Sequence, residues 1–234
     1  MARTALQRRL SWRVATLTAV RDETATARTL MLDVPDWPGH LPGQHVDVRL
    51  TAEDGYSTQR SYSLASDTGV ELTIQKVNDG EVSPYLAGTL KEGDPLELRG
   101  PVGGWFVWRP TDTQPVTLVA GGSGIVPLMA MIRARRTAGS RVPFRLIYSA
   151  RTPDDVIYAD ELRHPVGGLD VYHFYSRGTT RKRLGVAEVN THAWPAEFEP
   201  DCFVCGPTGF VERVADILVA LGHQPRKVKT ERFG

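Results

Sequence analysis

The pattern of apolar and polar positions divides the chain into two parts near residue 110. In the first part, short apolar runs alternate with segments rich in Gly, Pro and Asp. The run His45–Leu50 places Val46, Val48 and Leu50 on one face, as a strand with one buried side requires. Many short strands with few helical stretches are typical of an antiparallel barrel or sandwich. The predicted strands are 12–20, 29–34, 45–50, 61–64, 70–77 and 96–98.

One short helix is expected in this first part, over Ser83–Leu90. Serine is a preferred N-cap residue because its hydroxyl accepts a hydrogen bond from a free backbone amide of the first turn, and proline fits the first helical position. The sequence therefore predicts Ser83 as the N-cap and Pro84 as the first helical residue.

The second part follows a polar, proline-bounded segment and alternates strands with helices. Val116–Ala120 is apolar apart from Thr117, which is the pattern of a buried strand, and Ile125–Arg136 has apolar residues at helical spacing. Such alternation predicts a parallel sheet with helices on both faces. The predicted strands are 116–120, 144–149, 169–174, 201–205 and one containing residue 228, and the predicted helices are 125–136, 156–162 and 208–221.

The sequence thus predicts two domains: an antiparallel, Greek-key β-barrel over residues 1–110 and a Rossmann-like parallel α/β domain over residues 111–234. The charges nearly cancel, with 28 Lys and Arg against 27 Asp and Glu, which argues against a nucleic-acid partner. No uncharged apolar stretch approaches the roughly 18 residues of a membrane span, and the N-terminus lacks the apolar core of a secretory signal. We expect a cytoplasmic monomer with no membrane partner.

The chain contains two cysteines, Cys202 and Cys205. Two thiols cannot build a disulfide scaffold, a four-cysteine zinc site or a four-cysteine iron–sulfur cluster. We therefore expect no metal site. Cys205 precedes Gly206-Pro207 at the end of a predicted strand, where ligand crevices of open α/β sheets lie. A small buried apolar side chain is the alternative interpretation of Cys205.

Two further motifs suggest phosphate binding. Gly121-Gly122-Ser123-Gly124 joins a strand to a helix, where a bare backbone and free helix amides suit a pyrophosphate. The motif is not a P-loop, because no Gly-Lys-Ser/Thr is present. A plain tight turn, which would also use glycines, is the alternative. Arg60-Ser61-Tyr62-Ser63 offers a guanidinium, an aromatic ring and hydroxyls, with Arg60 and Tyr62 on one side of the strand. An ordinary amphipathic strand is the alternative there.

Taken in order along the chain, six motifs resemble the ferredoxin–NADP reductase superfamily. They are Arg60-x-Tyr62-Ser63, Gly80-Glu81-Val82-Ser83, Gly100-Pro101-x-Gly103, Gly121-Gly122-Ser123-Gly124-Ile125-x-Pro127, Cys205-Gly206-Pro207 and Glu231-Arg232-Phe233. The resemblance runs from about Trp12 to Gly234. It points to the flavin reductase module of bacterial oxygenase reductases, without a fused [2Fe–2S] ferredoxin domain.

The resemblance implies a flavin site on the barrel. Arg60 would bind a flavin phosphate, Tyr62 would lie against the isoalloxazine ring, and Ser63 would hydrogen-bond near N5. Ala65 would follow the flavin along its strand. The loop that would bind the FAD pyrophosphate is Gly80, Glu81, Val82 and Ser83. Relatives that use FMN carry an arginine-containing loop at this point, so FAD is expected rather than FMN.

The second domain would bind the nicotinamide nucleotide. The residues implied for this are Gly121, Gly122, Ser123, Gly124, Cys205, Gly206 and Pro207. Cys205 would sit beside the nicotinamide, Glu231 would lie near the flavin edge, and Phe233 would cover the flavin face opposite Tyr62. Ser63, Cys205 and Glu231 are the predicted catalytic residues, with Ser63 and Glu231 handling the N5 proton. Val126 departs from the family, which has threonine there.

A hydroxyl and several cations near the ends of strands 144–149 and 169–174 predict a preference for NADPH, because its 2′-phosphate rewards nearby guanidinium groups. The candidates are Arg151, Ser176, Arg177, Arg181 and Arg183. A solvated basic loop is the alternative. The predicted function is an oxidoreductase that passes electrons from NADPH through FAD to a separate one-electron carrier, such as a ferredoxin, a flavodoxin or an oxygenase component. The alternatives are a free-flavin or ferric-chelate reductase and a non-catalytic flavin-binding subunit.

Overall fold

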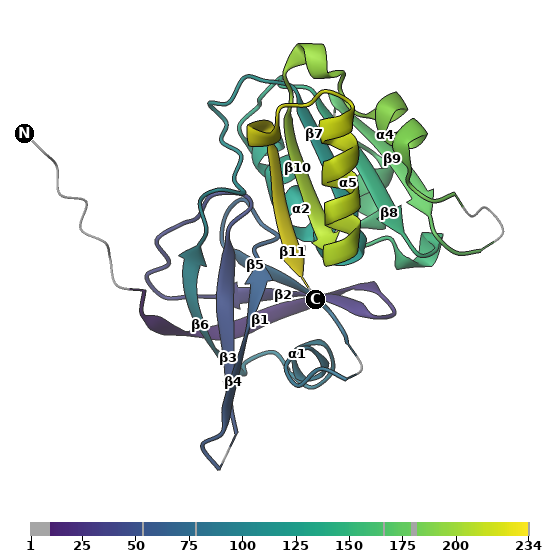
Figure 1. The fold of residues 1–234 in the computed structure, drawn as a ribbon. Helices are drawn as coiled ribbons and strands as arrows, with labels where there is room; N and C mark the ends of the chain where they lie inside the picture. Colours follow the sequence, from purple (N-terminus) through teal and green to yellow (C-terminus); the bar gives the residue numbers. More distant parts are fainter. Residues whose placement is uncertain (1–9, 53, 78, 166, 179–181, 234) are drawn as a thin grey trace, which may run out of the picture.

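A barrel of antiparallel strands and a parallel sheet covered by helices lie against each other (Figure 1). The computed structural model describes residues 10–233 except 53, 78, 166 and 179–181. The barrel strands are β1 (Trp12–Thr24), β2 (Ala27–Asp33), β3 (His45–Thr51), β4 (Ser57–Ser63), β5 (Val70–Gln75) and β6 (Pro95–Val102). Their order is β4-β3-β6-β1-β2-β5, and every pair is antiparallel.

The first and last strands of this order meet and close the barrel. Leu64 and Leu72 form a β-bridge, and the Ala65 N–H donates to the Glu71 carbonyl at 2.8 Å. Alternate residues of the strands point inward, so Val46 and Val48 of β3 are fully buried. The predicted barrel is therefore confirmed, and its closing contact lies just past the end of β4.

Helix α1 (Ser83–Gly88) covers one end of the barrel, with Leu86 buried in the barrel core. The prediction that Ser83 caps this helix was wrong. The N-cap is Val82, and the Ser83 hydroxyl instead accepts a hydrogen bond from the Val77 N–H at 3.0 Å. The hydroxyl is turned back toward the preceding loop, where it satisfies an amide that the end of β5 leaves unpaired.

The second sheet is parallel throughout. Its strands are β7 (Val116–Gly121), β8 (Phe144–Ala150), β9 (Leu169–Tyr175), β10 (Asp201–Pro207) and β11 (Val228–Phe233), in the order β11-β10-β7-β8-β9. The α-helices are α2 (Ile125–Thr137), α3 (Ala159–Arg163), α4 (Val186–His192) and α5 (Thr208–Ala220). Short 3₁₀ turns are η1 (Gly122–Gly124), η2 (Pro153–Asp155), η3 (Ala196–Phe198) and η4 (Pro225–Lys227). The predicted Rossmann-like sheet is confirmed.

Helices cover both faces of this sheet, as Figure 1 shows with α5 in front of the strands and α2 behind them. Leu118 and Phe203 face the cluster that includes α2 and α3, whereas Val119 and Val204 face the cluster that includes α4 and α5. Within the described residues, no helix is long and apolar enough to cross a membrane.

The predicted bounds of the helix over 156–162 were wrong. Only Ala159–Arg163 is α-helical, because Tyr158 just before it has a left-handed backbone with φ of 61°. A run of right-handed helical residues cannot pass through such a position. The left-handed turn directs Tyr158 into the contact with the barrel that is described below.

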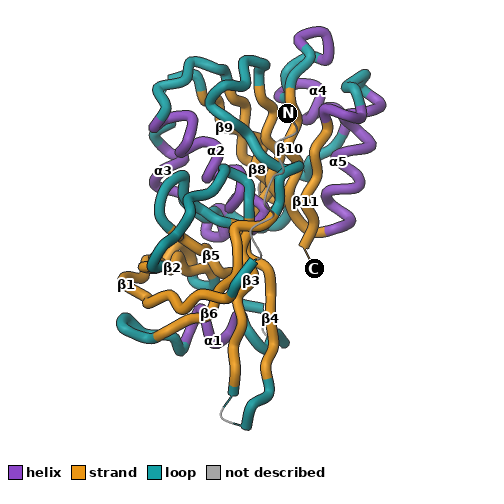
Figure 2. Tube along the Cα trace, turned by 90° about the vertical axis from the view of Figure 1, so that its left-hand side faces the viewer, coloured by secondary structure: helices purple, strands orange, loops and turns teal. Residues whose placement is uncertain are grey.

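The segment between β6 and β7 carries the proposed domain boundary at residue 110, and it is anchored on the second domain. The Phe106 ring meets Phe203 edge-on at 5.4 Å, and the fully buried Trp108 meets Phe144 at 5.2 Å. The tube view in Figure 2 shows the barrel directly below the parallel sheet. These contacts hold the connecting segment against the parallel sheet.

The turn after β7 packs against β10 with no room for a side chain. A Cβ on Gly124 would lie 2.1 Å from the Cys205 carbonyl oxygen and 2.7 Å from the Gly206 nitrogen, both of them backbone atoms. We predict that Gly124→Ala lowers the free energy of unfolding by about 1–3 kcal/mol, since overpacking must displace backbone. Urea unfolding measures this loss.

Gly209→Ala is the matched control for this prediction. Gly209 lies in α5 with nothing within 4 Å of an added Cβ, so alanine should leave stability unchanged or raise it slightly. Equal stability of the two variants would contradict the close packing described for Gly124.

Candidate active site

A cavity of about 620 Å³ opens at the carboxyl edge of the parallel sheet. Strand order reverses here, because the chain runs from β7 to β8 on one side and later returns to β10 on the other. Ligands of open α/β sheets bind at such a switch point. Eight of the predicted cofactor-binding residues line the cavity: Gly121, Gly122, Ser123, Arg151, Ser176, Arg183, Pro207 and Phe233.

The glycine turn leaves bare backbone on the cavity wall. Gly122 has φ of +55°, a conformation that favours glycine, and an added Cβ would meet only the Gln75 amide at 4.0 Å. Gly121 lies under the Phe210 ring, whose atoms would come within 2.8 Å of a Cβ. A ligand phosphate can therefore approach the chain closely at Gly122.

Three guanidinium groups surround the cavity: Arg151 after β8, Arg183 after β9 and Arg213 on α5. Among the described residues, none of the three forms an ion pair. Asp155 also lines the wall, but its carboxylate accepts hydrogen bonds from the Thr152 amide and hydroxyl. Unpaired guanidinium groups suit a ligand with several phosphates.

The sequence reasoning missed Arg213, as well as Gln75 and Val77, which reach the cavity from the barrel. A signal for Arg213 was present, because it follows Phe210 by three residues and so lies on the same helical face, one turn after the strand end. Gln75 and Val77 carry no such signal. Only the packing of the barrel on the second domain brings them to the cavity.

Ser63 and Glu231, which lie 168 positions apart in the sequence, meet at the junction of the two domains. The Ser63 hydroxyl at the end of β4 donates to Glu231 Oε1 at 3.0 Å. Glu231 in turn lies opposite Cys205, because β11 pairs with β10 in that register. The three predicted catalytic residues therefore come together from β4, β10 and β11.

Burial governs the ionisation of this group of residues. It raises the pKa of the Glu231 carboxyl, and the hydrogen bond from Ser63 opposes that change. Burial raises the pKa of the Cys205 thiol well above its usual range, and the nearby Glu231 charge adds to the effect. The thiol is therefore neutral at physiological pH, and Glu231 takes up a proton more readily than an ordinary carboxylate.

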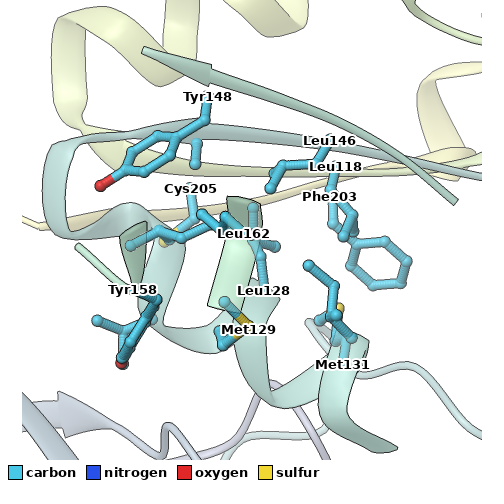
Figure 3. Close-up of a cluster of buried hydrophobic side chains, with 14 of the residues drawn as sticks. Leu118, Leu128, Met129, Met131, Leu146, Tyr148, Tyr158, Leu162, Phe203 and Cys205 are labelled. Atoms are coloured by element: carbon cyan, nitrogen blue, oxygen red, sulfur yellow. The ribbon is translucent and has the colours of Figure 1, made fainter. Parts of the chain in front are cut away.

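Cys205 does not line the cavity. It is fully buried in the apolar cluster between the sheet and α2, where Figure 3 shows it among side chains such as Tyr148 and Leu162. Gly124 and Gly206 are also absent from the cavity wall, since both pack against neighbouring backbone. The role of Cys205 beside a nicotinamide remains a prediction.

On the barrel side, the register of β3 and β4 places Tyr62 opposite Val46 and Arg60 opposite Val48. Residues directly opposite share a face of the sheet, so Arg60 and Tyr62 lie on one side and Ser63 on the other. Arg60 is exposed, and the hydrogen bonds of its guanidinium to described residues go to groups of its own strand. Tyr62 is half-buried, and burial raises the pKa of its phenol to about 12, so it stays protonated.

The loop before α1 offers mainly backbone. The Val82 side chain is buried in the barrel core, and the Gly80 N–H donates to the Val77 carbonyl at 3.0 Å. Glu81 Oε2 accepts a 3.5 Å hydrogen bond from the Tyr56 hydroxyl.

Ala65, which was predicted to follow the flavin, is fully buried, and its carbonyl accepts a hydrogen bond from Arg133 at 2.9 Å.

The two remaining predicted cations are Arg177 and Arg181. The Arg177 N–H donates to the Arg151 carbonyl at 2.8 Å, but Arg177 does not line the cavity. Arg181 lies outside the described residues. In the part of the chain that the structure describes, no group of three or more His, Cys, Asp or Glu side chains is arranged to hold a metal ion.

Comparison with known protein families matches each domain separately. Residues 13–107 match the oxidoreductase FAD-binding domain, and residues 118–216 match the oxidoreductase NAD-binding domain. The chain belongs to the ferredoxin–NADP reductase superfamily. The resemblance inferred from the six motifs is thereby confirmed, and so is the pairing of an FAD domain with a domain for a pyridine nucleotide.

Relatives of this family include reductase subunits of oxygenase systems. The glycine betaine monooxygenase reductase subunit of Pseudomonas aeruginosa is 33% identical over 92% of this chain and 62% of its own length. The ferredoxin reductase component of the 3-ketosteroid-9-alpha-monooxygenase of Rhodococcus rhodochrous is 31% identical over 94% of this chain and 64% of its own length. The chain thus spans somewhat less than two thirds of these relatives.

Solved structures have the same two-domain fold. The FAD/NAD-binding domain of the nitric oxide dioxygenase of Vibrio cholerae superposes with a TM-score of 0.83 at 25% identity, covering 95% of this chain and 98% of that one. A ferredoxin reductase of carbazole 1,9a-dioxygenase gives 0.81 at 26% identity, covering 97% and 71%.

Because the pKa of Glu231 is raised in the folded state, we predict that the stability difference between Glu231→Gln and the unmodified protein depends on pH. The native state holds a proton on Glu231 at pH values where the unfolded chain has lost it, so this stability is present below about pH 4 and is lost as pH rises through the raised pKa. Glu231→Gln removes the titration and keeps an acceptor for Ser63. We expect the variant to match the unmodified protein at low pH and to exceed its stability near neutral pH by an amount on the order of 1 kcal/mol.

Urea unfolding of both proteins across this pH range measures the difference. Glu92→Gln, at an exposed turn, is the control for replacing a carboxyl with an amide. A constant difference between Glu231→Gln and the unmodified protein at every pH would contradict the raised pKa.

Proposed function

We propose that this protein is an oxidoreductase that takes electrons from NADPH through FAD and passes them to a separate one-electron acceptor protein. The Ser63–Glu231 hydrogen bond carries the proposal, because it joins the barrel strand predicted to bind the flavin to the strand that ends at the nucleotide cavity. The proposed setting is the cytoplasm, with the protein acting as a monomer.

The residues present fit both groups. Arg60 has no carboxylate partner among the described residues and is free to bind an FAD phosphate, and the half-buried Tyr62 offers an aromatic face. The cavity, with bare backbone at Gly122 and three unpaired guanidinium groups, fits a nicotinamide dinucleotide. When bound, FAD supplies acceptance of a hydride at N5 and release of single electrons.

The chain itself positions these groups and handles a proton. Ser63 and Glu231 form a short path along which a proton can be held at the flavin edge, and the raised pKa of Glu231 suits that task. Phe233 lines the cavity at the end of β11 and would cover the ring face opposite Tyr62 until a nicotinamide takes its place. Cys205, one strand away from Glu231, would support the nicotinamide side of the pocket.

The acceptor is proposed to be an oxygenase component or the ferredoxin that serves one, because the relatives named above are reductase subunits of oxygenases. A flavodoxin is a further acceptor of the same class. The alternatives are a free-flavin or ferric-chelate reductase and a flavin-binding subunit without catalysis.

An acceptor panel tests this proposal. We expect the purified protein to carry FAD, to be bleached anaerobically by NADPH, and to reduce cytochrome c rapidly only when a ferredoxin is added. Fast turnover with free flavin or ferric chelate alone would favour the alternative enzymes. Bound FAD that NADPH fails to bleach would favour the non-catalytic subunit.

The preference for NADPH rests on the cavity guanidinium groups, and Arg151→Gln and Arg183→Gln test it. Each change should raise the KM for NADPH about tenfold, the effect of losing roughly 1.4 kcal/mol from a charge-assisted hydrogen bond, and should leave the KM for NADH nearly unchanged. Steady-state kinetics with both nucleotides measures the ratio.

Arg163→Gln is the matched control, because Arg163 lies on α3 in an exposed ion pair with Asp160 away from the cavity. An equal rise in KM for NADPH and NADH would indicate that the arginine contacts the pyrophosphate and not the 2′-phosphate. Comparable efficiency with both nucleotides in the unmodified protein would overturn the preference itself.

A further inference from the structure

One buried arginine links the two domains directly. Arg133 lies on α2 and is only 7% exposed. Its Nη1 donates to the Ala65 carbonyl at 2.9 Å and to Glu71 Oε2 at 3.1 Å, and both acceptors belong to the barrel. Its Nη2 donates to Glu161 of α3 at 2.8 Å. A single guanidinium therefore holds the barrel and two helices of the second domain together.

Tyr158 makes a second contact between the domains, next to that of Arg133. The Arg133 guanidinium lies 4.9 Å from the centre of the Tyr158 ring. The Tyr158 hydroxyl and the Thr73 hydroxyl of β5 form a hydrogen bond of 2.5 Å that is buried at the junction. Tyr158 reaches this place through its left-handed backbone, a conformation that costs free energy for a residue with a side chain. The surrounding contacts must offset that cost.

These contacts connect the two halves of the proposed site. Ala65 lies two residues beyond Ser63, the last residue of the strand that carries Arg60 and Tyr62. Helix α2 begins directly after the glycine turn that lines the nucleotide cavity. A helix is a stiff element, so fixing Arg133 against Ala65 also fixes the glycine turn relative to the flavin-side strand.

We propose that Arg133 is a positioning residue for hydride transfer, which sets the distance between the nicotinamide and the flavin by holding α2 against the Ala65 carbonyl. The inference rests on the proposed function. Because a misplacement of about 1 Å between reacting groups costs up to about a hundredfold in rate, a loosened junction should slow the transfer step more than it weakens binding.

Arg133→Met in the full chain with FAD tests the proposal, since methionine keeps much of the apolar stem and removes every hydrogen bond. We expect the limiting rate of flavin reduction by NADPH in stopped flow to fall about tenfold to a hundredfold. The Kd for NADPH and the reoxidation of reduced flavin by ferricyanide should stay nearly constant, because neither depends on the distance between the two rings. Independently of turnover, backbone hydrogen exchange over residues 64–73 should become faster.

Arg136→Met is the matched control. Arg136 lies on the same helix and pairs with the same Glu161, an ion pair that lies within the second domain and does not reach the barrel. The change should leave both the reduction rate and the exchange over 64–73 unaltered. Tyr158→Phe removes only the bond to Thr73 and provides the same comparison if Arg133→Met does not fold, with a smaller loss of rate expected.

The inference is overturned if a folded, FAD-containing Arg133→Met protein reduces its flavin at an unchanged rate. If Arg133→Met does not fold, an unchanged rate in Tyr158→Phe overturns it. A parallel loss of NADPH binding and ferricyanide reoxidation also overturns it, because general damage would then explain the result. If the unmodified protein itself fails to reduce its flavin, the proposed function fails. Even in that case, unchanged backbone hydrogen exchange over residues 64–73 in Arg133→Met would show that Arg133 does not hold the barrel against α2.

Discussion

The parallel pairing of β11 with β10 is the constraint on which the junction of this molecule depends. In that register Glu231 lies opposite Cys205, and Phe233 lies opposite Pro207 at the cavity. A slip of one residue would turn every side chain of β11 to the other face and break the Ser63–Glu231 hydrogen bond. The single strand β11 thus holds both a carboxyl at the barrel and an aromatic ring at the cavity.

Electrostatics differs sharply between the two ends of the site. The cavity mouth has three exposed guanidinium groups that form no ion pair within the described part of the chain, so a phosphate can pair with them there. At the Ser63–Glu231 contact lie a half-buried carboxyl with a raised pKa and, beside it, a buried and neutral thiol. Burial is the largest cause of both raised pKa values, since it disfavours charge where water is excluded.

Much of the fold was predictable because its pattern is local. The alternation in His45–Leu50 and the apolar run Val116–Ala120 record which side of each strand is buried, and the structure confirms both. The errors at Ser83 and at 156–162 also have local causes, a hydroxyl turned to the preceding loop and a left-handed residue at 158. Neither leaves a signal in the pattern of apolar positions.

The candidate site was only partly predictable. Gly122 and Arg183 could be found from motifs that follow strands, because the carboxyl ends of parallel strands meet at one edge. Arg133, Gln75 and Tyr158 could not, since each acts through a contact between domains far apart in sequence.

The sequence by itself determined the two-domain plan, the family and the residue types available for phosphates and for a flavin, because periodicity and motifs are properties of short segments. Only the tertiary structure decided that Ser63 meets Glu231, that Cys205 is enclosed in the core, and that Arg133 ties the barrel to α2. Those outcomes depend on how two sheets pack and on which groups lose their water, and no short segment encodes either.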